Sequence, residues 1–173
     1  ISDYIVDDFL SQSNPENNRV ALETLVTTNQ VVVSGEVRGP EDFECNYEKL
    51  AREAVKWIGY EQEKFHWENF NFTSFVHGQS SDIAMGVDAK DNKDQGAGDQ
   101  GIMFGYACKE TPVLMPAPIY YSHLILQNLA KARKEKTISG IQPDSKSQVT
   151  LQYEGSRPIN CTEVVVSTQH DKE

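Results

Sequence analysis

Two short segments of this sequence carry the residues best suited to chemistry. The first, residues 96–107, holds four glycines and Asp99. Glycine lets the backbone approach a ligand closely, and an acid placed there could bind an ammonium group or ribose hydroxyls. The same pattern fits a tight turn that Asp99 caps. On these residues alone, both interpretations stay open.

In the second segment an acid, a hydroxyl and an amine follow one another, at Asp144, Ser145 and Lys146, just before residues typical of a strand. On an extended chain Asp144 and Lys146 share a face. A carboxylate for ribose hydroxyls beside an amine for phosphates predicts a nucleotide clamp. The alternative is a surface turn whose ion pair contributes little stability.

Two further acids, Glu23 and Glu36, stand inside otherwise apolar segments. A carboxylate on a buried strand face needs a cation or hydrogen-bond donors, whereas one on the polar face points to water. The four histidines (His66, His77, His123 and His170) are scattered, and none pairs with another at a spacing typical of a metal site.

The hydrophobic pattern shows which elements must position these residues. A helix over residues 47–58 is predicted with Leu50, Ala54, Trp57 and Ile58 on one face and Gly59 as its stop. Taken along the chain, the pattern predicts helices over 1–10, 47–58 and 116–136, and strands over 19–27, 30–37, 70–76, 101–108, 149–153 and 163–168.

Residues 77–98 form a polar stretch, rich in glycine and aspartate, between two apolar segments. Loops of this length are uncommon in compact domains unless they have a function. We expect a mobile active-site lid here. A solvated surface loop is the alternative.

Charge and cysteine content narrow the class of protein. The 173 residues carry 16 Lys and Arg against 26 Asp and Glu, a net charge of −10, which argues against binding to nucleic acid or to an anionic membrane. A polyanionic ligand would therefore need metal cations or a few focused basic residues. Three unclustered cysteines and no apolar run of about 20 residues favour a reduced, cytoplasmic protein.

Together these segments resemble the S-adenosylmethionine synthetase (methionine adenosyltransferase) family. The resemblance rests on residues 96–107 and 143–150, with further matches, in the family's order, at 21–24, 34–36, 79–80, 82–83, 114–119 and 167–171. It implies an α+β fold of repeated domains, each a mixed β-sheet with helices packed on one face. The expected division is an N-terminal domain over 1–82, a mobile loop over 83–95 and a central domain over 96–173.

The resemblance also implies roles for individual residues. Glu36, Gln79 and Asp99 would bind methionine, and Glu23 would sit at a potassium site. ATP would be bound by Asp144, Ser145 and Lys146, and the catalytic residues would be Lys146 and Asp99. The flexible loop would comprise Gln79, Ser80, Ser81, Asp82, Ile83, Ala84, Met85, Gly86, Val87, Asp88 and Ala89.

The implied reaction joins ATP and L-methionine. Methionine sulfur attacks the ribose C5′ carbon, and the released triphosphate is hydrolysed to phosphate and pyrophosphate. Two Mg²⁺ per active site and K⁺ would neutralise charge. The implied assembly is a homodimer or a homotetramer built as a dimer of dimers, with active sites at the subunit interface.

The sequence departs from the family pattern in three respects. The family's Gly-His-Pro-Asp-Lys motif, expected just upstream of Ile1, and its C-terminal third are not in these residues, so we expect a longer natural chain. Ser81 and Met85 differ from the usual loop residues. The alternative is a truncated, non-catalytic relative that acts as a dimerising or regulatory subunit.

Overall fold

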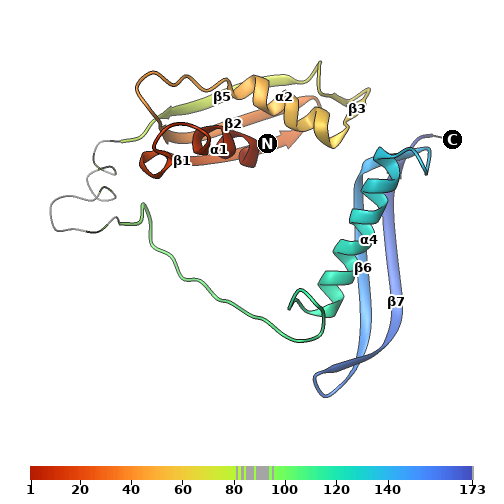
Figure 1. Cartoon of the computed structure of the whole chain (residues 1–173). Coiled ribbons are helices and arrows are strands. Elements are labelled where there is room, and N and C mark those ends of the chain that lie inside the picture. The colour runs from red at the N-terminus through yellow and green to blue at the C-terminus, as the bar shows by residue number, and fades with distance from the viewer. Residues whose placement is uncertain (81, 83, 85–87, 89–93, 95, 173) are drawn as a thin grey trace. The chain divides into compact units, whose positions relative to one another are not determined.

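The computed structural model describes residues 1–80, 82, 84, 88, 94 and 96–172. The chain divides into two compact units, Ile1–Gly101 and Ile102–Glu173 (Figure 1). Each unit combines helical structure with a sheet, which confirms the predicted α+β class. In the part of the chain that is described, no helix is long and apolar enough to cross a membrane.

The first unit is built on a mixed three-stranded sheet. Its strands are β1 (Arg19–Thr27), β2 (Gln30–Arg38) and β5 (Asn71–Gly78), in the order β1-β2-β5. β1 and β2 form an antiparallel hairpin, and β5 lies parallel to β2. The hairpin turns at Asn29, whose φ of 54° is the left-handed conformation that asparagine tolerates.

Two helices, α1 (Ser2–Leu10) and α2 (Tyr47–Ile58), cover one face of this sheet (Figure 1). Asn46 caps α2 by accepting a hydrogen bond from the Lys49 N–H, and Gly59 ends it with a φ of 103°. The predicted helix bounds are confirmed. The connection to β5 carries a small hairpin that the sequence did not predict, β3 (Glu61–Gln62) with β4 (Phe65–His66).

The core of the first unit lies between the helices and the sheet. Val33 of β2 packs with Ile5 and Phe9 of α1, and Val31 packs with residues of α2 and with Phe70. Trp57 was expected on the buried face of α2, but it is 65% exposed. Ala54 is buried and Leu50 packs against the core as predicted, and Ala51 and Val55 complete the buried face in place of Trp57.

The second unit consists of α4 (Ala117–Lys134) packed on a hairpin of β6 (Ile141–Glu154) and β7 (Arg157–His170) (Figure 1). Both strands have 14 residues and are longer than predicted. Along β6, Ser145, Ser147 and Val149 are partly buried while the residues between them are exposed. This alternation separates a helix-facing side of the hairpin from an open side.

The predicted strand over residues 101–108 was wrong. These residues form no helix or strand, and Ile102, Met103 and Phe104 are 79%, 88% and 89% exposed. A strand needs a neighbouring strand for its backbone hydrogen bonds, and the described residues offer none here. Hydrophobicity alone therefore misled the prediction.

Candidate functional site

One face of the first unit's sheet carries the two strand acids. Glu23 of β1 lies opposite Ser34 of β2, and Glu36 lies opposite Ala21, so both carboxylates project from the same face. The buried valines project from the other face, where the helices pack. Glu23 is exposed and Glu36 half-buried. Of the two alternatives for these acids, a buried strand face or a polar one, the structure shows the second. Both carboxylates lie on the face of the sheet away from the core.

Gly35 allows the backbones of β1 and β2 to approach each other closely beside Glu36. Its φ is 135°, and a Cβ atom on it would lie 2.0 Å from the carbonyl oxygen of Ala21. Only glycine fits such a contact between β1 and β2. Gly35 stands between Ser34 and Glu36, so it shapes the strand where the acid is presented.

Glu36 contacts the segment that follows β5. The Ser80 N–H donates to Glu36 Oε2 at 3.5 Å, and the Gln79 N–H donates to the Val37 carbonyl at 2.9 Å. The side-chain oxygen of Gln79 is buried, yet no described group donates to it. A buried acceptor without a donor is costly, so it marks a place where a polar ligand could bind. Two of the residues predicted to bind methionine, Glu36 and Gln79, are therefore linked through their immediate neighbours Val37 and Ser80.

Asp99 is not brought to this place by any contact between described residues. It is exposed, and its Oδ1 accepts a hydrogen bond of 2.7 Å from the next backbone N–H, that of Gln100. This is the local turn that the sequence left open as an alternative. The role of Asp99 in binding stays a prediction.

In the second unit, Asp144, Ser145 and Lys146 lie inside β6 rather than in a turn before it. Asp144 and Lys146 are exposed on the open side of the hairpin, as their spacing predicted. Neither forms an ion pair with another described residue, so the surface ion pair considered as an alternative is not formed. Ser145 points to the other side, and its hydroxyl lies 2.7 Å from that of Thr168 on β7.

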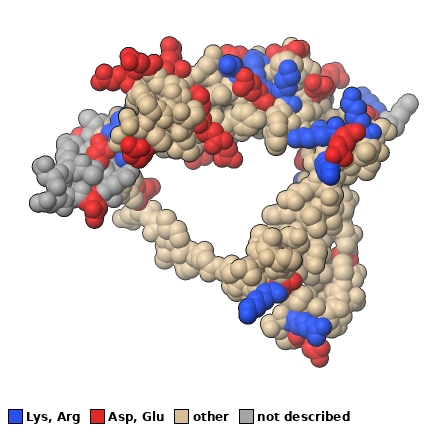
Figure 2. Space-filling view, in the orientation of Figure 1, with Lys and Arg blue, Asp and Glu red and all other residues tan. Residues whose placement is uncertain are grey.

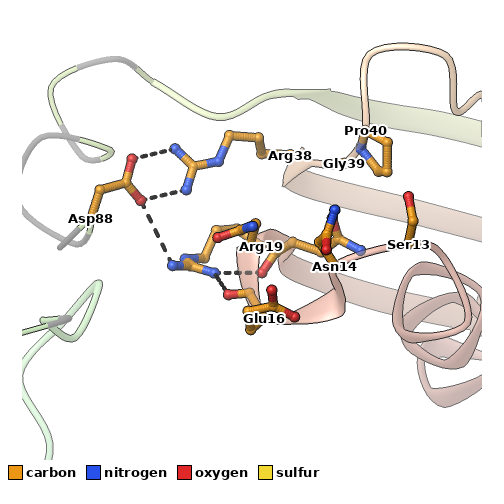
Figure 3. A pocket seen from close by; sticks show the side chains of 10 residues that line it. Ser13, Asn14, Glu16, Arg19, Arg38, Gly39, Pro40 and Asp88 are labelled. Carbon is orange, nitrogen blue, oxygen red and sulfur yellow. Dashed lines mark hydrogen bonds and ion pairs between the residues drawn. The ribbon is translucent and has the colours of Figure 1, made fainter.

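A separate pocket opens where β1 begins and β2 ends (Figure 3). It has a volume of about 680 Å³, and Arg19, Arg38 and Asp88 line it together with the turn at Asn14. Arg38 donates two hydrogen bonds to the Asp88 carboxylate, at 2.7 and 2.5 Å. This contact raises the pKa of the Arg38 guanidinium, against an opposing effect of burial.

Sequence reasoning missed this cluster. Arg19 is the first residue of β1 and Arg38 the last of β2, and the two strands have nine residues each on either side of a short turn. Counting outward from the turn would have placed them opposite one another. No local signal pointed to Asp88 as their partner.

Glu110 is a second residue that the sequence analysis passed over. Its Oε2 accepts hydrogen bonds from the Ala117 N–H at 2.8 Å and the Tyr153 hydroxyl at 2.7 Å. The Ala117 N–H is at the start of α4, so Glu110 satisfies a helix terminus. The bond from Ala117, followed by that from Tyr153, lowers the pKa of Glu110. The same contact raises the pKa of Tyr153 to about 12.

The charge distribution follows the composition. Figure 2 shows acidic side chains over much of the first unit and basic ones at the end of α4, whose last turn carries Lys131, Arg133 and Lys134. Cations at a helix C-terminus complement the helix dipole. Among the described residues, no three His, Cys, Asp or Glu side chains come together in a group that could hold a metal ion.

Comparison with models of known protein families shows to which family the chain belongs. Residues 1–81 match the model of the N-terminal domain of S-adenosylmethionine synthetase, and residues 94–173 match the model of its central domain. The chain belongs to the S-adenosylmethionine synthetase family. The resemblance deduced from the sequence motifs is confirmed.

Individual relatives agree with this family assignment. Proteins named S-adenosylmethionine synthase from Rhodospirillum centenum and Paramagnetospirillum magneticum are 60% and 61% identical over 172 and 171 residues. A third, from Granulibacter bethesdensis, is 58% identical over 173 residues. The alignments cover 98–99% of this chain but only 43–44% of those relatives, so the chain spans less than half of their length.

Within the synthetase framework, the predicted site residues fall into groups in the two units. Glu23, Glu36 and Gln79 lie in the first unit, where Ser80, the neighbour of Gln79, donates to Glu36, and Asp144, Ser145 and Lys146 lie on β6 of the second. Of the predicted flexible loop, Ser81, Ile83, Met85, Gly86, Val87 and Ala89 lie outside the described residues.

Proposed function

We propose that the protein to which this chain belongs makes S-adenosylmethionine from ATP and L-methionine. The observation that carries the proposal is the match of both units to one family, at 60% identity over 99% of the chain for the Rhodospirillum centenum relative. Methionine sulfur attacks ribose C5′, the bond from C5′ to oxygen breaks, and triphosphate leaves with the electron pair. Water then cleaves triphosphate into phosphate and pyrophosphate.

The first unit supplies the methionine side of the proposed site. Glu36 and Gln79 bind the amino acid, with Asp99 holding its amino group. The unsatisfied buried oxygen of Gln79 supports this role, because an ammonium or amide donor would satisfy it. Asp99 is exposed and carries no charged partner among the described residues, so its carboxylate is accessible to a ligand.

The second unit supplies the ATP side. Asp144 binds ribose hydroxyls, and Lys146 lies near the phosphates and stabilises the charge that develops on the leaving triphosphate. Ser145 lies between them with its hydroxyl on the other side of β6, so its contact with ATP would come from its backbone. The exposed positions of Asp144 and Lys146 on the open side of β6 support these roles, since both side chains are free to meet a substrate. Such a reaction depends mainly on alignment of the reactants and charge neutralisation.

Two Mg²⁺ per active site and K⁺, with Glu23 at the potassium site, belong to the same proposal. The described residues do not assemble a metal site by themselves. Mg²⁺ commonly takes ligands from substrate phosphates and water besides one or two carboxylates. When bound, these ions would supply positive charge against the triphosphate.

The proposed assembly is a homodimer or a dimer of dimers with active sites between subunits, located in the cytoplasm. The strand face that carries Glu36 supports a covered interface, because exposed apolar side chains lie on it as well: Leu25 is 58% and Phe75 65% exposed. The free cysteines at 45, 108 and 161 fit a reducing compartment.

The test is a product assay of the complete purified protein with ATP, L-methionine, Mg²⁺ and K⁺. We expect S-adenosylmethionine, phosphate and pyrophosphate in equal amounts. A folded protein that binds ATP or methionine but forms no S-adenosylmethionine would overturn the proposal and favour a non-catalytic, regulatory subunit. The intact mass of the purified protein, measured first, establishes which chain has been assayed.

A further inference from the structure

At the open end of the β1–β2 hairpin, two arginines lie opposite one another. Arg19 is the cross-strand partner of Arg38. Like charges directly opposite one another destabilise a strand pair. Both side chains are largely shielded from water, with exposures of 18% and 32%. An anion between or beside the two guanidinium groups would therefore stabilise this strand pair.

That anion is the carboxylate of Asp88, which follows Arg38 by 50 residues. Both terminal nitrogens of Arg38 bind its two oxygens, and Arg19 Nη2 lies 3.7 Å from Oδ1 (Figure 3). Two parallel hydrogen bonds of this kind are the strongest arrangement between a guanidinium and a carboxylate. Asp88 thus relieves the repulsion between the two arginines.

Arg19 is held in place independently of Asp88. Its Nη1 donates to the carbonyls of Glu16 and Asn18 at 2.7 and 2.8 Å. Its Nε is buried, and no described group accepts from it. A guanidinium fixed by backbone carbonyls loses little freedom when a carboxylate arrives, so it is prepared to receive one.

The residues that lead to Asp88 begin beside Glu36. Backbone hydrogen bonds join Ala84 to Ser80 and Asp88 to Ala84 at 3.0 and 2.9 Å, both with helical spacing. Ser80 itself donates to Glu36. β2 thus contacts both ends of this stretch, through Glu36 at Ser80 and through Arg38 at Asp88, two residues apart on the same side of the strand.

We propose that Arg19, Arg38 and Asp88 are positioning residues that form an ionic anchor, which keeps Gln79 and Ser80 against Val37 and Glu36 of β2. Only the predicted effect of the anchor on methionine binding rests on the proposed function. It acts through Gln79 and Glu36 and needs no contact with the substrate. Because all three side chains remain partly exposed, added salt weakens it.

The test is hydrogen–deuterium exchange of the peptide that contains Ala84 and Asp88, in the intact protein without substrates. D88N keeps the shape of the side chain and removes its charge, and we expect exchange at these two amides to rise about fivefold. D82N makes the same chemical change at an exposed acid of the same stretch, and it leaves exchange unchanged. Equal exchange in D88N and D82N would overturn the anchor.

Thermal unfolding tests the electrostatic repulsion between Arg19 and Arg38. D88N lowers the midpoint of thermal unfolding, and the double variant R38Q/D88N unfolds at a higher temperature than D88N, because only one guanidinium then remains. An incidental surface ion pair predicts no recovery. A double variant that unfolds at or below the D88N midpoint therefore contradicts the proposal.

The effect on the proposed reaction is measured separately. D88N raises KM for methionine by several-fold with little change in kcat, whereas E53Q, an exposed acid of α2, changes neither. An unchanged KM despite faster exchange would overturn the positioning role. If the wild-type protein forms no S-adenosylmethionine, the proposed function fails, while the exchange and unfolding results still decide whether the anchor exists.

Discussion

The carboxylate of Glu110 lies 2.7 Å from the hydroxyl of Tyr153, although 43 residues separate them in the sequence. The contact ties the turn before α4 to the end of β6. It joins the segment that follows the glycine-rich motif to the strand that carries Lys146. A charge-assisted hydrogen bond therefore holds parts of the second unit together, in addition to apolar packing.

The ionisation of Tyr153 tests this contact. Its pKa is raised to about 12 because the phenol donates to Glu110, so removing the negative charge with E110Q should bring it toward the ordinary value of 10. Ultraviolet difference titration of tyrosinate measures the change. Y153F identifies the contribution of this tyrosine among the seven. A phenol that titrates near 10 in the wild type would show that the bond does not form in solution.

Acid stability tests the other partner. The pKa of Glu110 is lowered below its ordinary 4.5, first by the Ala117 N–H and then by Tyr153. A group with a lowered folded pKa contributes stability above its unfolded pKa and loses it as pH falls through the folded value. The wild type should therefore lose stability below about pH 4.5 more steeply than E110Q, as measured by urea unfolding across pH.

Replacement of Gly35 should disrupt the first sheet. An alanine there would place its Cβ 2.0 Å from the Ala21 carbonyl oxygen, at a φ of 135°. We expect G35A to lower the free energy of unfolding by at least about 2 kcal/mol. G78A is the matched control, because no atom lies within 4 Å of its added Cβ. Equal stability of the two variants would contradict the close approach of β1 and β2.

The thiols should differ in reactivity. Burial, aided by a hydrogen bond with Asp8, raises the pKa of Cys45 to about 12, whereas Cys161 is exposed. Since the thiolate is the reactive species, iodoacetamide at pH 8 should label Cys161 well before Cys45. Peptide mapping of the modified protein over time measures the order. Labelling of Cys45 at the rate of Cys161 would argue against the burial of Cys45.

Lys146 tests the proposed ATP side. Its side chain is exposed on β6, so K146Q should leave the fold intact while lowering kcat for S-adenosylmethionine formation by about a hundredfold. Lys131, which pairs with Glu135 on the surface of α4, provides the control K131Q. A K146Q variant with unchanged kcat would remove Lys146 from the proposed catalytic residues.

Much of the fold was predictable because its signals are local. The α2 helix carries its own cap at Asn46 and its own stop at Gly59, and the alternation in β6 placed Asp144 and Lys146 on one face. The family likewise follows from short motifs of contiguous residues. The prediction for residues 101–108 failed because a strand is defined by its neighbour, and hydrophobicity does not report one.

By itself the sequence determined most of the order of helices and strands, the family and the residue types available for chemistry, since each depends on neighbouring residues. The β3–β4 hairpin and the absence of a strand over residues 101–108 came from the structure. Only the tertiary structure decided that Arg19 faces Arg38, that Asp88 pairs with both, and that Ser80, next to Gln79, reaches Glu36. These contacts join residues tens of positions apart. Their distances depend on sheet register and on packing of the whole unit, which no local pattern encodes.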